Sequence, residues 1–150
     1  MQAMIVRMNL LMATGAIAIL FAGCGPSKVA QCNEIVKVAN QAATVGQEFA
    51  AVSQSKDSGK AAQSFTEAAN KIDKLSKDMQ ALEIKDEKLQ GFQGRFVKMY
   101  QDTNKGLRDG AVALQKKNLP AINKALQGIK AGASQESSLV SEVNSYCSGK

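Results

Sequence analysis

The sequence contains no histidine among its 150 residues. This absence excludes histidine-ligated metal sites, c-type haem attachment and every catalytic arrangement in which histidine activates a serine or cysteine. Tryptophan is also absent, and the only aromatic residues are two tyrosines and five phenylalanines. With two prolines, little in the chain interrupts a helix. We therefore predict a protein that is not an enzyme, with no catalytic residues, no metal site and no cofactor.

A short apolar stretch near the N-terminus has the features of an export signal. Arg7 is the only charged side chain before Lys28, and the apolar stretch covers residues 10–22. It is shorter than the roughly 20 apolar residues that a transmembrane helix needs, and Pro26 stops it from continuing as a helix. A basic start, an apolar stretch and small residues before the cut are the parts of a secretory signal.

The residues that end this stretch, Leu-Phe-Ala-Gly-Cys at 20–24, resemble the lipobox of bacterial lipoproteins. Phe21 departs from that pattern, in which a branched aliphatic residue is usual at this place. The resemblance implies cleavage before Cys24 and attachment of palmitate-type acyl chains to that cysteine. An ordinary signal peptide cut elsewhere, or an uncleaved anchor, is the alternative. Three methionines are possible starts of the chain: Met1, Met4 and Met8.

Apolar residues recur at helical spacing along the rest of the chain, which predicts four helices. We expect them at residues 28–55, 60–82 and 87–117, and from 119 to 147. The stripe of the first is Cys32, Ile35, Val38, Ala42, Val45, Phe49 and Val52, widened by Ala39, Ala43 and Gly46. The second has a seam of heptad type: Ala61, Phe65, Ala68, Ile72, Leu75, Met79 and Leu82. The fourth stripe is Ile122, Leu126, Ile129, Ala133, Val140, Val143 and Cys147, with Glu136 as its polar exception.

Capping residues separate these segments. Asp57 or Ser58 is expected to cap the second helix, Asp86 the third and Asn118 the fourth. Short turns between long helices mean that consecutive helices are antiparallel. The sequence therefore predicts an all-α fold, an up-down-up-down four-helix bundle after an N-terminal signal peptide. Its expected parts are a signal peptide over 1–23, a lipid-anchored linker over 24–31 that keeps the body close to the bilayer, and the bundle over 32–149.

Two cysteines remain once Cys24 is assigned to the anchor. Cys32 opens the first helix and Cys147 closes the fourth, so an up-down-up-down bundle brings both to the same pole. Both lie on inward stripes, and an exported protein meets an oxidising compartment. We therefore predict a structural Cys32–Cys147 disulfide. The alternative, a redox-active pair, usually needs closely spaced cysteines and an activated thiolate, and nothing in this sequence suggests either.

Several other residues allow both a functional and a structural interpretation. Adjacent Asp86 and Glu87 suit a helix N-terminus better than a cation site, and Met79 and Met99 suit packing. Glu136 is either a buried functional carboxylate or a side chain that reaches solvent through a local rotation of the helix. A basic cluster around the second and third helices is the candidate for contact with lipid headgroups or an acidic partner, the alternative being a solvated surface: Lys71, Lys74, Lys85, Lys88, Arg95 and Lys98.

The anchor and the expected bundle together resemble small helical lipoproteins of cyanobacteria, including the Q-type extrinsic subunits of photosystem II. That likeness implies an accessory role in the lumen. More broadly, we expect a protein tethered to a bacterial membrane through Cys24, facing periplasm, lumen or cell exterior, that binds a protein partner as an accessory of a membrane complex. Export argues against a nucleic-acid partner. The alternatives are a carrier with a cavity of roughly 300 Å³ or more for a small apolar ligand, and an inhibitor of an exported enzyme.

Overall fold

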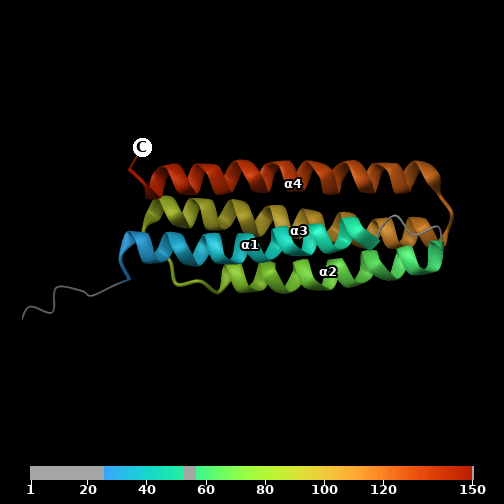
Figure 1. Cartoon of the computed structure of the whole chain (residues 1–150), viewed down its shortest axis with the longest axis horizontal. Helices are drawn as coiled ribbons and strands as arrows, with labels where there is room; N and C mark the ends of the chain where they lie inside the picture. The colour runs from blue at the N-terminus through green and yellow to red at the C-terminus, as the bar shows by residue number, and fades with distance from the viewer. Residues whose placement is uncertain (1–25, 53–56, 150) are drawn as a thin grey trace, which may run out of the picture.

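The structure is a computed structural model that describes residues 26–52 and 57–149. Its four helices are α1 (Lys28–Val52), α2 (Ser58–Gln80), α3 (Glu87–Gln115) and α4 (Leu119–Cys147). Consecutive helices run in opposite directions along one long axis (Figure 1). The predicted all-α, up-down-up-down bundle is therefore confirmed. None of the helices among the described residues is long and apolar enough to cross a membrane.

The caps expected from the sequence start three of the helices. The Asp57 carboxylate accepts a hydrogen bond from the backbone N–H of Gly59 at 2.8 Å. Asp86 accepts from the N–H of Leu89 at 3.0 Å, and the Asn118 side chain accepts from the N–H of Ala121 at 3.1 Å. These bonds satisfy backbone donors that a helix leaves free in its first turn.

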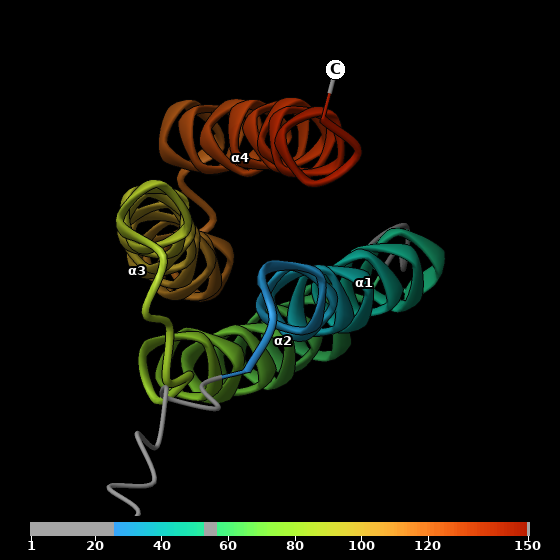
Figure 2. The same ribbon diagram turned by 90° about the vertical axis from the view of Figure 1, so that its left-hand side faces the viewer.

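The core lies mainly between α2 and α3, with α1 packed beside α2 and α4 beside α3 (Figure 2). Every residue of the predicted α2 seam within the helix is buried, as the heptad spacing indicated. The largest fully buried side chains come from α1, α2, α3 and α4: Tyr100, Phe96, Ile35, Met79, Leu89, Leu139 and Val143.

The outer helices are covered less evenly than the sequence predicted. Only Ala125, Leu139 and Val143 of α4 are buried, whereas Leu126 on the predicted stripe is 41% exposed. Ala133, also on that stripe, is exposed. The prediction was wrong here because α1 and α4 diverge away from the pole where the N-terminus of α1 and the C-terminus of α4 meet (Figure 2), so α4 packs chiefly on α3.

Gly110 of α3 marks a place where three helices approach closely. A Cβ added there would lie 2.6 Å from Cδ1 of Phe65 on α2 and 3.2 Å from the Cβ of Ala125 on α4. Glycine is the residue that leaves this space free, so its helix-destabilising effect is offset by closer packing.

Replacing Gly110 with alanine is expected to destabilise the protein by about 1–3 kcal/mol, because the Phe65 ring must move out of a packed core. The matched control is Gly128→Ala on α4, where nothing lies within 4 Å of the added Cβ. That change should stabilise the helix by up to about 1 kcal/mol. Urea unfolding of both variants measures the difference, and equal effects would contradict the close approach.

Candidate functional site

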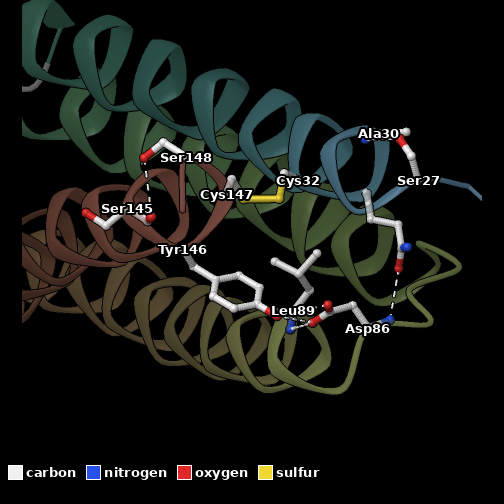
Figure 3. The surroundings of a disulfide bond; sticks show 10 residues. Ser27, Ala30, Cys32, Asp86, Leu89, Ser145, Tyr146, Cys147 and Ser148 are labelled. Atoms are coloured by element: carbon white, nitrogen blue, oxygen red, sulfur yellow. Dashed lines mark hydrogen bonds between the residues drawn. A yellow bond between two sulfur atoms is a disulfide. The ribbon is translucent and has the colours of Figure 1, made fainter. Parts of the chain in front are cut away.

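The disulfide closes one pole of the bundle. Cys32 of α1 and Cys147 of α4 are bonded, with their Cα atoms 6.3 Å apart (Figure 3). This confirms the predicted pairing. Cys24, the predicted lipidation site, lies outside the described residues.

Gln31 binds the same pole to the α2–α3 loop. Its side-chain carbonyl oxygen accepts hydrogen bonds from the backbone N–H of Lys85 at 2.6 Å and of Asp86 at 3.0 Å. Its amide donates to the backbone oxygen of Pro26 at 2.8 Å. Gln31 belongs to the first turn of α1, which begins at Lys28, and its side chain is buried.

Tyr146 connects the end of α4 to the start of α3. Its hydroxyl donates a 2.9 Å hydrogen bond to the cap residue Asp86, whose side chain lies beside it in Figure 3. The ammonium groups of Lys28 and Lys88 lie 3.6 Å and 4.7 Å from the centroid of the Tyr146 ring, within the range of cation–π attraction. Hydrogen bonds from Leu89 N–H and from Tyr146 lower the pKa of Asp86, so this carboxylate stays charged.

The structure places most of the predicted basic cluster in ion pairs with the protein's own carboxylates. Four of the six side chains are paired in this way: Lys71 with Glu48, Lys74 with Asp78, Arg95 with Glu142 and Lys98 with Asp102. Of the other two, Lys85 is exposed and Lys88 lies near Tyr146. Exposed pairs add little stability, but they reduce the positive charge offered to a partner. Contact with headgroups or an acidic partner stays a prediction.

A large concave surface with mainly apolar walls lies between α1 and α4. It is a groove of about 650 Å³, formed where the two helices diverge (Figure 2). The α1 wall consists mainly of small residues, including Ala39, Ala43, Gly46 and Ala50. The α4 wall is more bulky and includes Leu126, Ile129, Ala133 and Val140. Exposed apolar surface of this kind, gathered in one place, marks sites of protein or ligand binding.

A small cavity continues from the groove toward the core. Its volume is about 60 Å³, and Phe49, Ile72, Met99 and Tyr100 are among the residues that line it. Pockets that hold drug-sized ligands measure roughly 300–1,000 Å³. The cavity is therefore too small for such a ligand, and the larger space is the groove that opens to solvent.

Glu136 is the acidic residue that lines both the groove and the cavity. It is half-buried, and its Oε1 accepts a 2.9 Å hydrogen bond from the hydroxyl of Tyr100 on α3. Burial raises the pKa of Glu136, and the bond from Tyr100 opposes this shift. Burial, with the nearby Glu136 charge, also raises the pKa of Tyr100. The sequence allowed Glu136 to be either buried or exposed to solvent. In the structure its side chain is intermediate between the two.

Glu136→Gln is expected to make the protein more stable at pH 7 than the unmodified chain. Because burial raises the pKa of Glu136 in the folded state, the protonated form favours folding, and this contribution is lost as the pH rises through that pKa. Glutamine is neutral and still accepts a hydrogen bond from Tyr100. The stability difference between the two proteins should vanish near pH 4, as measured by urea unfolding at both pH values; a variant less stable at pH 7 would contradict it.

Sequence reasoning missed Tyr100 and Leu139, which are both fully buried. Tyr100 was not among the expected core residues, but its spacing of four from the buried Phe96 was a usable signal. Leu139 has the same spacing from Val143.

No family model, curated protein or solved structure matches the chain, so the groove must be interpreted from its own geometry.

Proposed function

We propose that this protein is a lipid-anchored helical bundle on the outer side of a bacterial membrane, where it binds a protein partner as an accessory subunit of a membrane complex. Its role is binding and involves no catalysis. The observation that carries the proposal is the apolar groove between α1 and α4, which a soluble bundle with a closed core has no need to expose.

The same geometry supports partner binding over the carrier alternative. A carrier would enclose its apolar ligand, and the cavity below the groove has a volume of only about 60 Å³. The groove, by contrast, is open along the seam between two helices, as expected for a surface that another protein covers. An inhibitor of an exported enzyme would use the same surface, and the identity of the partner distinguishes the two roles.

The proposed anchor orients this surface. Cys24 precedes the first residue of α1, Lys28, by four positions, so the lipid and the start of the helix are at most about 14 Å apart. The disulfide pole would then lie next to the bilayer. The groove begins at Ala39, which lies about 17 Å further along the helix. A partner bound in the groove would therefore lie above the lipid headgroups, on the side away from the membrane.

Photo-crosslinking in intact cells tests the proposal. A photoreactive amino acid is placed at Gly46 or Ala133 in the groove, and at the exposed Gln101 of α3 as a matched control outside it. After membrane solubilisation and affinity capture, mass spectrometry identifies the products. We expect one stoichiometric membrane-complex protein from the groove positions only. A groove that yields no protein adduct, or the same adducts as Gln101, would overturn the proposal.

A further inference from the structure

The dimensions of the groove match those of a helix. The α4 wall extends from Leu126 to Val140, a separation of 14 positions and about 21 Å at the rise of an α-helix. The opposing α1 wall consists mainly of alanine and glycine, with Asn40, Gln47 and Phe49 beside them. The small residues allow another backbone to approach closely. A helix of three to four turns that lies along two diverging helices uses the common helix-in-groove mode of recognition.

Polar side chains also line the groove: Asn40, Gln47, Lys130, Ser137 and Glu136. Glu136 is the acidic residue among them. The Oε1 atom of Glu136 accepts the hydrogen bond from Tyr100. Its Oε2 atom accepts none from the residues that the structure describes, and it is not buried. No ion pair with Glu136 occurs there either. The titratable groups that line the groove and cavity with it are Tyr100 from α3 and Lys130 from α4. A partner that covers this carboxylate with apolar surface removes its water, which is costly unless the partner brings a cation or hydrogen-bond donors.

We propose that the groove receives an amphipathic helix of the partner protein, which presses its apolar face on α1 and α4 and directs one lysine or arginine at the Oε2 atom of Glu136. The inference rests on the proposed function and names the chemistry of the partner. The basic side chain supplies the donor that Oε2 needs once the partner covers it, and the bond from Tyr100 to Oε1 holds the carboxylate in place. A charge-assisted hydrogen bond of this kind adds geometric specificity to an otherwise apolar contact.

The test repeats the crosslinking from Ala133 in three backgrounds: the unmodified chain, Glu136→Gln, and Glu34→Gln as a control. Glu34 is an exposed acidic residue of α1 outside the groove, so both variants remove one negative charge. We expect the crosslinked peptide to be helical, with lysine or arginine within one turn of the attachment point. Glu136→Gln should lower the yield about tenfold, the effect of losing roughly one charged hydrogen bond, while Glu34→Gln leaves it unchanged.

A charge exchange makes the result specific. Glu136→Lys should abolish the crosslink, and changing the partner's basic residue to glutamate should restore it. Urea unfolding of each variant, with Glu136→Gln expected to be at least as stable as the unmodified chain at pH 7, separates lost binding from lost folding.

The other outcomes each overturn part of the scheme. A partner crosslink that persists at full yield in Glu136→Gln, or that maps to a segment without a basic residue, rejects this inference and leaves the proposed function standing. The absence of any protein crosslink rejects both. Crosslinks to a second copy of the chain, or to its own residues 1–23, would replace the partner helix by those occupants. A small molecule retained in native mass spectrometry and lost in Glu136→Gln would indicate an amphiphilic ligand instead.

Discussion

Replacing Cys24 with serine is expected to move the protein from the membrane fraction to the soluble fraction. The proposed anchor is acyl chains on Cys24, and two or more chains are needed for stable attachment. None of the described helices offers a membrane-spanning alternative. Cell fractionation with detection of the protein in each fraction measures the effect, and metabolic labelling with a palmitate analogue tests for the lipid directly.

The matched control for this prediction is Cys32→Ser, which removes a cysteine of the disulfide pole and should leave the protein on the membrane with its label. Retention of Cys24→Ser in the membrane fraction would count against lipid tethering and favour an uncleaved N-terminal anchor. Loss of the label without loss of membrane association would show that a protein partner alone holds the bundle there.

Opening the Cys32–Cys147 disulfide is expected to produce the largest loss of stability of any change considered. The bond closes a loop with a sequence separation of 115 residues. For a loop of this size the chain-entropy model gives a loss of about 4–5 kcal/mol in the free energy of unfolding, as an upper estimate. The melting temperature should fall by on the order of 10–20 °C. The melting temperature of the double variant Cys32→Ser/Cys147→Ser, followed by circular dichroism during heating, provides the measurement.

Reduction offers an independent check of the same bond. The unmodified chain in reducing agent should melt at the temperature of the double variant, whereas the double variant should not respond to the reagent. If reduction lowers stability by less than about 1 kcal/mol, the contacts of Gln31 and Tyr146 at this pole hold α1 and α4 in place, and the entropic account fails for this protein.

Local sequence signals were sufficient for most of the fold. Asp57, Asp86 and Asn118 are capping residues whose side chains bond to backbone donors only a few residues away. The α2 seam follows from heptad spacing, because every residue on it faces the same neighbour. The disulfide followed from connectivity, since helix number and direction already place Cys32 and Cys147 at one pole.

The candidate site was much less accessible to such reasoning. Gln31 accepts hydrogen bonds from backbone groups more than 50 residues away, and no local pattern marks a residue with that role. The apolar residues Leu126 and Ala133 were assigned to the core because their spacing is helical. Periodicity identifies the apolar face of a helix, but it does not indicate whether another helix covers that face.

The sequence by itself determined the helices, their caps, their order and the pairing of the cysteines, because each of these depends on neighbouring residues or on the course of the chain. The tertiary structure alone decided that α1 and α4 diverge, that a groove of about 650 Å³ opens between them, and that Tyr100 of α3 donates a hydrogen bond to Glu136 of α4. The physical reason is that the divergence depends on how side chains of all four helices fill the core together. Small residues such as Gly110 set those distances, and their effect appears only when the helices are packed.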